Sequence, residues 1–257
     1  RELFGDDPPA VAVVLTTYAL LVSYGGAYDA AETMFTQALA IYDARDEGAG
    51  FPAYVTLSYR AAMEDLRGNS ASAREWALRA LAIQDQPPVQ DHPRVANTLF
   101  TLGVAEAALG QPAEAAVALA RAVTIDRAAR GETHPYLALA LSSLAAARAA
   151  LGDDTGATRA LAEAFDVARR FYGADAPQAT DAQAALAEKR LEIGDYEGAL
   201  PLLRDLATRL ARLFGGVEVE TVFSARLRLG VVLNNLGAYA EAEDVTVALL
   251  REASSVL

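Results

Sequence analysis

The two histidines, His92 and His134, are the side chains best suited to acid–base or metal chemistry. They lie 42 residues apart, and each directly precedes a proline. Equivalent positions in a repeat favour a role at helix starts and in packing between repeats over a role in catalysis. The paired carboxylates Asp6-Asp7 and Asp153-Asp154 are expected in loops or turns, as solvated surface or helix caps.

The composition of the chain excludes several classes of function. The chain has no cysteine, which excludes disulfides, thiolate nucleophiles and thiolate metal sites. It contains no glycine-rich phosphate loop, metalloprotease helix motif or serine elbow. The net charge of -12 repels phosphate, and no apolar stretch reaches the roughly 18 residues that span a membrane. We therefore expect no catalytic residue, no cofactor, no metal, no direct contact with nucleic acid and no membrane segment.

Small residues recur at a fixed interval. The recurring glycines are Gly26, Gly68, Gly110, Gly152 and Gly194, each 42 residues apart, and Gly237, which follows at 43. An alanine stands five residues after each of them, and an alanine or glycine stands seven residues before each. Three aligned positions over six units indicate a true repeat.

Each unit is predicted to be an antiparallel pair of helices. The glycine ends the first helix, apolar residues recur at helical spacing on both sides of it, and the small residues let the two backbones approach. First helices (helices A) are expected at about 10–24, 52–67, 93–109, 135–151, 178–193 and 220–236. Second helices (helices B) are expected at about 28–45, 70–84, 112–129, 154–171, 196–213 and 239–254. Residues 84–91, with two prolines, are expected to be extended.

Two further motifs share this period. His-Pro stands before helix A at 92–93 and 134–135, with Ala-Pro at 176–177 and Pro-Pro at 8–9 in the same position. The second motif ends in glycine: it reads Arg-Glu-Leu-Phe-Gly at 1–5, Arg-Phe-Tyr-Gly at 170–173 and Arg-Leu-Phe-Gly at 212–215. These motifs and the small residues resemble tetratricopeptide repeats, in the 42-residue variant found in kinesin light chains.

The resemblance implies an all-α fold, a right-handed superhelix of six antiparallel helix pairs in one domain. The repeats fall at about 9–50, 51–92, 93–134, 135–176, 177–218 and 219–257, and residues 1–5 are the end of a preceding helix. An extra residue near Gly215-Gly216 and a missing proline set the sixth repeat apart. The arginine bias and the mid-repeat start suggest a piece of a larger, cytoplasmic bacterial protein.

The resemblance also implies a concave groove lined by helices A, at positions 13, 10, 9, 6, 3 and 2 residues before each turn glycine. The residues chosen from these positions are Thr17, Tyr24, Tyr59, Asn97, Phe100, Thr101, Ser142, Ser143, Asp181, Glu188, Arg228 and Asn235. Because Arg228 is the only basic residue in the groove, a clamp for a peptide carboxylate is disfavoured. Tyr24, Tyr59 and Phe100 could form an apolar platform, and Asp181, Glu188 and Glu192 would favour a cationic partner.

Alternatives remain open at these residues. Tyr24 and Tyr59 could pack between repeats, and Glu188 and Glu192 could be a solvated helix face. The expected function is a non-catalytic module that binds a protein or peptide, as the scaffold or sensor part of a signalling or regulatory protein. One alternative is a sensor for a small molecule or signalling peptide, which a deep pocket near Tyr24, Tyr59 and Phe100 would favour. The other is a self-assembly element that dimerises through exposed ends.

Overall fold

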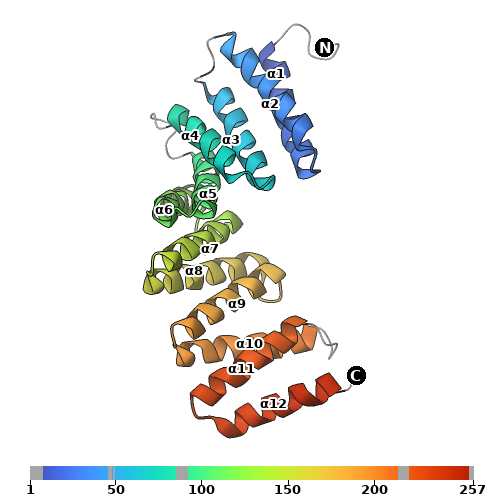
Figure 1. Cartoon of the computed structure of the whole chain (residues 1–257), viewed down its shortest axis with the longest axis vertical. Helices are drawn as coiled ribbons and strands as arrows, with labels where there is room; N and C mark the ends of the chain where they lie inside the picture. The colour runs from blue at the N-terminus through green and yellow to red at the C-terminus, as the bar shows by residue number, and fades with distance from the viewer. Residues whose placement is uncertain (1–7, 46–47, 49, 85–91, 214–219, 255–257) are drawn as a thin grey trace. The chain divides into compact units, whose positions relative to one another are not determined.

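The computed structural model describes residues 8–45, 48, 50–84, 92–213 and 220–254. Within these ranges the chain forms twelve helices and no strand (Figure 1). Four expectations lie outside the described residues: the helix end at residues 1–5, the Asp6-Asp7 loop, the extended segment through residue 91 and the insertion near Gly215-Gly216.

The helices alternate as A and B in every repeat. Helices A are α1 (Pro8–Tyr24), α3 (Phe51–Leu66), α5 (Pro93–Ala108), α7 (Pro135–Ala150), α9 (Pro177–Glu192) and α11 (Glu220–Asn235). Helices B are α2 (Tyr28–Asp43), α4 (Ser70–Gln84), α6 (Pro112–Arg130), α8 (Asp154–Tyr172), α10 (Tyr196–Leu213) and α12 (Tyr239–Ser254). The expected all-α fold of six antiparallel pairs is confirmed, and each boundary lies within two residues of the prediction.

The chain divides into two compact units, residues 1–131 with α1 to α6 and residues 132–257 with α7 to α12. Within each unit, every helix A packs on its own helix B, and every helix A after the first also packs on the helix B before it, as α3 does with α4 and α2. Apolar side chains from neighbouring repeats share one core in this way. In the second unit, for example, Ala187 of α9, Leu203 of α10 and Leu233 of α11 are all buried. No described helix is both long and apolar enough to cross a membrane.

The small residues face each other across the turn, as the repeat predicts. The turn glycine adopts a left-handed conformation, with φ 74° at Gly110, which ends α5 at little cost. Gly103 and Ala115 then meet so closely that a Cβ on Gly103 would lie 3.2 Å from the Ala115 carbonyl oxygen. Close approach of the helix pair therefore depends on both small side chains.

A polar pair spans each of three turns, and its charge differs between the units. In the first unit Asn69 Nδ2 donates to Glu64 Oε2 at 3.1 Å. In the second unit Arg148 and Arg190 take the glutamate's position, four residues before the turn glycine, and pair with Asp153 and Asp195. Those aspartates also cap helices B, where Asp153 Oδ1 accepts from the Gly156 amide at 2.9 Å.

Candidate binding surfaces

The aromatic residues predicted for the groove lie on helices A of the first unit. Tyr24 on α1 is 70% exposed, whereas Tyr59 on α3 and Phe100 on α5 are half-buried. Arg94 holds Tyr59 in place: its Nη1 donates to the Tyr59 hydroxyl at 2.8 Å, and its guanidinium lies 5.8 Å from the ring centroid. Tyr59 also packs against the buried core around Met63. Tyr59 thus packs in the core and is also partly exposed at the surface, whereas Tyr24 lies exposed to solvent.

The polar groove residues of the first unit differ in what they offer a partner. Thr17 is exposed, but its hydroxyl donates to the Val13 carbonyl at 3.0 Å. Asn97 is exposed, and its Oδ1 accepts from Arg130 Nη1 at 3.0 Å. Thr101 is buried and presents little surface. The accessible chemistry of this face is therefore mainly apolar.

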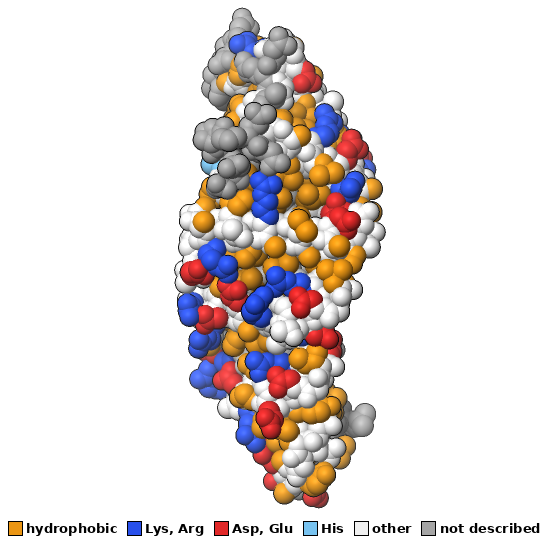
Figure 2. Space-filling view, turned by 90° about the vertical axis from the view of Figure 1, so that its left-hand side faces the viewer, with side chains coloured by type: hydrophobic (Ala, Val, Ile, Leu, Met, Phe, Trp, Pro, Cys, Tyr) orange, Lys and Arg blue, Asp and Glu red, His pale blue; other side chains and the backbone are white. Residues whose placement is uncertain are grey.

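In the second unit the predicted residues pair largely with one another. Glu188 on α9 binds Arg228 on α11 at 3.0 Å. Glu192 binds Lys189 at 3.1 Å, whereas Asp181 is exposed and has no ion pair within the described ranges. Asn235 Nδ2 donates to the carbonyl of Val231 in its own helix, and Ser142 and Ser143 are half-buried. Most of the acidic surface expected from the fifth repeat is neutralised inside the unit, and charged side chains of both signs lie beside one another there in Figure 2.

Exposed apolar side chains occupy the same groove positions. They are Val13 on α1, Leu139 on α7, and Leu227 and Val231 on α11, each about half exposed. Helices A thus carry large apolar side chains toward solvent in both units, at positions set by the repeat.

The histidines take the role that their spacing predicts. His92 and His134 precede α5 and α7, and their Nδ1 atoms accept from the amides of Arg94 and Tyr136 at 3.2 and 3.3 Å. His92 also meets Phe51, the first residue of α3, edge to face, at 5.7 Å between ring centroids. Among the described residues, no group of three or more potential ligands could hold a metal ion.

Two titratable groups have shifted pKa values. Burial raises the pKa of Asp65, which lies half-buried near the end of α3. A hydrogen bond to Asp154 raises the pKa of Lys189, with a second contribution from Glu192. Lys189 Nζ lies 2.6 Å from Asp154 Oδ1 and therefore ties α9 to α8.

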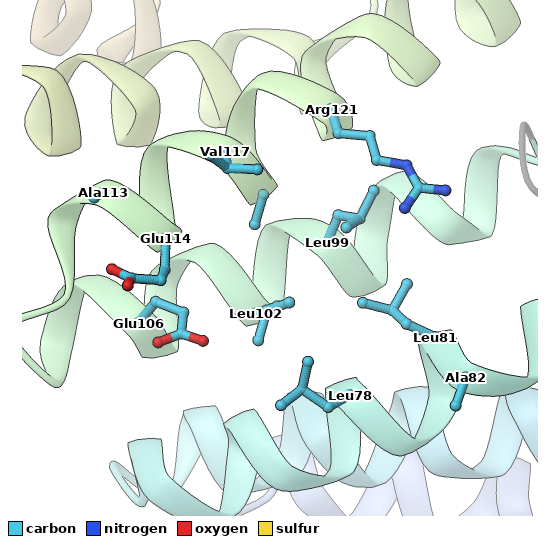
Figure 3. A pocket seen from close by; sticks show the side chains of 11 residues that line it. Leu78, Leu81, Ala82, Leu99, Leu102, Glu106, Ala113, Glu114, Val117 and Arg121 are labelled. Carbon is cyan, nitrogen blue, oxygen red and sulfur yellow. The ribbon is translucent and has the colours of Figure 1, made fainter. Parts of the chain in front are cut away.

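A cavity of about 610 Å³ lies between α4, α5 and α6. Figure 3 shows Leu78, Leu99 and Leu102 on its floor and sides, with Glu106 and Glu114 at one end. Tyr24, Tyr59 and Phe100 do not line it, so this cavity gives no support to a small-molecule site at those aromatics. The groove positions did not predict it, and leucine both eight and eleven residues before the turn glycine also occurs in the fourth repeat, so the sequence alone does not single it out.

Comparisons with known proteins agree with the repeat pattern. Residues 53–128 match the family model described as Tetratricopeptide repeat. No curated relative matches the chain in sequence. Among solved structures, the repeats of a putative kinesin light chain from Podosopora anserina share 20% identity over 78% of this chain and 94% of that chain, with a TM-score of 0.64.

Two other solved structures are similar in fold. A signal transduction ATPase with numerous domains and a tetratricopeptide repeat sensor, from Pyrococcus horikoshii, matches at 16% identity over 98% of this chain, with a TM-score of 0.72. This chain spans 40% of that protein's length. A Rap protein complexed with competence and sporulation factor matches at 16% identity over 94% of this chain and 66% of that chain, with a TM-score of 0.53. Residues 53–128 thus match the tetratricopeptide repeat family, and the helix-pair fold is that of solved tetratricopeptide-like repeat structures, including the kinesin light chain repeats.

Proposed function

We propose that the chain is a non-catalytic module that binds a protein or peptide through its helices A, as the scaffold or sensor part of a larger bacterial signalling or regulatory protein. The observation that carries the proposal is the exposure of large apolar side chains at the repeat's groove positions, with Tyr24 and Leu139 as examples. Aromatic and aliphatic anchors of this kind dominate the affinity of recognition surfaces. Two similar folds support the context, one with a tetratricopeptide repeat sensor and one complexed with competence and sporulation factor.

The test uses the whole chain and a library of random peptides displayed on phage. Selected peptides would be synthesised, and their affinity measured by fluorescence anisotropy against Tyr24→Ala and Phe100→Ala variants. We expect each substitution to weaken binding by about tenfold or more, because a buried aromatic anchor contributes upward of about 1 kcal/mol. Circular dichroism would verify that helix content is retained.

Tyr18→Ala is the matched control, since Tyr18 is also an exposed tyrosine of α1 but lies outside the groove positions. Peptides that bind the Tyr24→Ala and Phe100→Ala variants as well as the unaltered chain would remove the assignment to helices A. Loss of binding in Tyr18→Ala alone would point to the outer face of α1 instead.

A second candidate, self-association, is favoured by that outer face. Val14, Tyr18 and Leu21 are exposed, with Leu21 at 61%. In α3 the equivalent residues include Arg60 and Met63, which are buried against α2. Sedimentation velocity at micromolar concentrations tests this: a dimer that Leu21→Asp dissociates supports it, and a monomer across the concentration range argues against it.

A further inference from the structure

The side chains that fill the gap between consecutive helices B differ along the chain. Between α2 and α4, Arg60 of α3 fills the gap: its Nη2 donates to Glu32 Oε1 at 3.1 Å, and its guanidinium lies 3.8 Å from the Trp76 ring centroid. Arg60 stands eight residues before its turn glycine, Gly68. One long polar side chain thus links α2, α3 and α4.

The second unit uses the same positions. Gln183 of α9 stands eleven residues before Gly194, and its Nε2 donates to Leu202 O at 2.8 Å and Asp205 Oδ2 at 2.9 Å in α10. Arg209 donates to Gln183 in turn. Farther along, Arg204 of α10 pairs with Glu241 of α12 at 2.6 Å. In these repeats the floor or the rim of the gap is polar and internally hydrogen-bonded.

The gap between α4 and α6 has leucine at both floor positions. Leu102 takes the place of Arg60, and Leu99 takes the place of Gln183. Neither leucine is long enough to bridge the two helices B, and the result is the cavity of about 610 Å³. Leu78 of α4 and Val117 of α6 stand at its rim, the latter 73% exposed. An apolar trough remains where α3 and α9 place polar links.

One end of this cavity holds a carboxylate with unmet hydrogen-bonding capacity. Glu106 is 4% exposed; its Oε1 accepts from Arg74 Nε at 2.8 Å, and its Oε2 has no hydrogen-bond partner in the described part of the chain. Glu114 lies at the same end and forms no ion pair within the described residues (Figure 3). Two carboxylates beside one guanidinium leave a net negative charge. A buried acceptor without a donor is unfavourable, so a donor supplied from outside would be stabilised there.

The geometry points to a second binding site, between α4 and α6, for a short amphipathic helix of a partner protein that carries a lysine or arginine at one end of its apolar stripe. Along α6 the lining runs from Ala113 to Arg121, a rise of about 12 Å, which matches two turns of a bound helix. Its apolar side chains rest on Leu99 and Leu102, and its cation donates to Glu106 Oε2 beside Glu114. The site lies on helices B and α5, apart from the groove positions, and does not depend on the function proposed above.

The test measures binding of fluorescein-labelled helical peptides to the whole chain by anisotropy. Each peptide carries leucines at i, i+4 and i+7 and, at either end of that stripe, lysine, glutamine or glutamate. We expect the best lysine peptide to bind about tenfold more tightly than its glutamate counterpart at low salt, and the difference to shrink as salt is added. Val117→Asp and Leu78→Asp should weaken binding by about tenfold or more, since both residues are rim contacts.

Glu106→Gln separates the two parts of the proposal. It should reduce the preference for lysine to about threefold or less while leaving leucine-dependent binding in place. Leu151→Asp, a comparably exposed leucine of the second unit, is the matched control and should change nothing. Tyr24→Ala and Phe100→Ala should also leave this binding intact, which separates it from binding at the groove positions.

Three outcomes would overturn the proposal. They are the absence of peptide binding in the micromolar to millimolar range, equal affinity for lysine and glutamate peptides, and undiminished affinity in the Val117→Asp and Leu78→Asp variants. Because both variant positions are exposed, loss of folding is not expected, and circular dichroism verifies it.

Discussion

Replacing Gly103 with alanine tests the close approach of α5 and α6. A Cβ at this position would lie 2.5 Å from Leu119 Cγ and 3.2 Å from the Ala115 carbonyl oxygen, both closer than ordinary van der Waals contact. Leu119 is fully buried, so the side chain or the helix must move. Gly230 occupies the same position in α11, but a Cβ there would meet nothing closer than Thr246 Oγ1 at 3.6 Å. The two glycines form a matched pair.

Two effects of opposite sign decide the result. Overpacking a buried site costs about 1–3 kcal/mol, and exchanging glycine for alanine within a helix gains about 1 kcal/mol. Gly103→Ala should therefore lower the free energy of unfolding by about 1 kcal/mol, whereas Gly230→Ala should raise it by about 0.5–1 kcal/mol. At about 2–4 °C per kcal/mol for a chain of this size, the two Tm values should shift in opposite directions.

Differential scanning calorimetry gives the two Tm values. Amide hydrogen exchange then shows whether the effect of Gly103→Ala is confined to α5 and α6, since repeat arrays can unfold in parts. A rise in Tm for Gly103→Ala equal to that for Gly230→Ala would refute the reasoning. It would mean that Leu119 relaxes beside alanine, as Leu203 does beside Ala187 in the equivalent pair of the second unit.

Three further perturbations have defined signs. Because burial raises the pKa of Asp65, the charged form of Asp65 opposes folding. This destabilisation is absent below the unfolded pKa near 3.8 and grows as pH rises through the higher folded pKa. In a calorimetric pH series, Asp65→Asn should therefore raise Tm at about pH 7 and not at about pH 3. Arg209→Met removes the donor to Gln183, Thr180 and the Ala174 carbonyl and should cost about 1–3 kcal/mol in urea unfolding, with faster amide exchange in α9 and α10. Unchanged stability would contradict the role of these bonds. Lys189→Met removes the pair with Asp154 and should cost at most about 1 kcal/mol at neutral pH, and less at pH values above the raised lysine pKa, where the unaltered chain has lost the same charge.

Much of the fold could be predicted because the repeat is set by local rules. Proline and histidine at residues 92–93 start a helix through backbone geometry and a cap only two residues away, so the sequence alone is sufficient. The ion pair of Glu188 with Arg228 joins residues 40 positions apart, and it depends on the rotamers of both side chains. The spacing of residues in the sequence does not define those rotamers, so it could not predict the pair. Likewise, Leu99 and Leu102 look like ordinary core residues in the sequence. Only the lateral distance between α4 and α6 shows that no neighbouring side chain spans the gap above them.

The polar pairs at the turns have a consequence for exchanging repeats. Glu64 with Asn69 and Arg190 with Asp195 each lie within one repeat, so a transplanted helix pair would bring both partners along. A transplanted single helix would not: joining the Glu64 helix to a helix that begins with Asp195 would set two carboxylates against each other at the turn. The modular unit for recombination in this chain is therefore the complete helix hairpin, and shuffled arrays cut inside a hairpin should be recovered less often than arrays cut between hairpins.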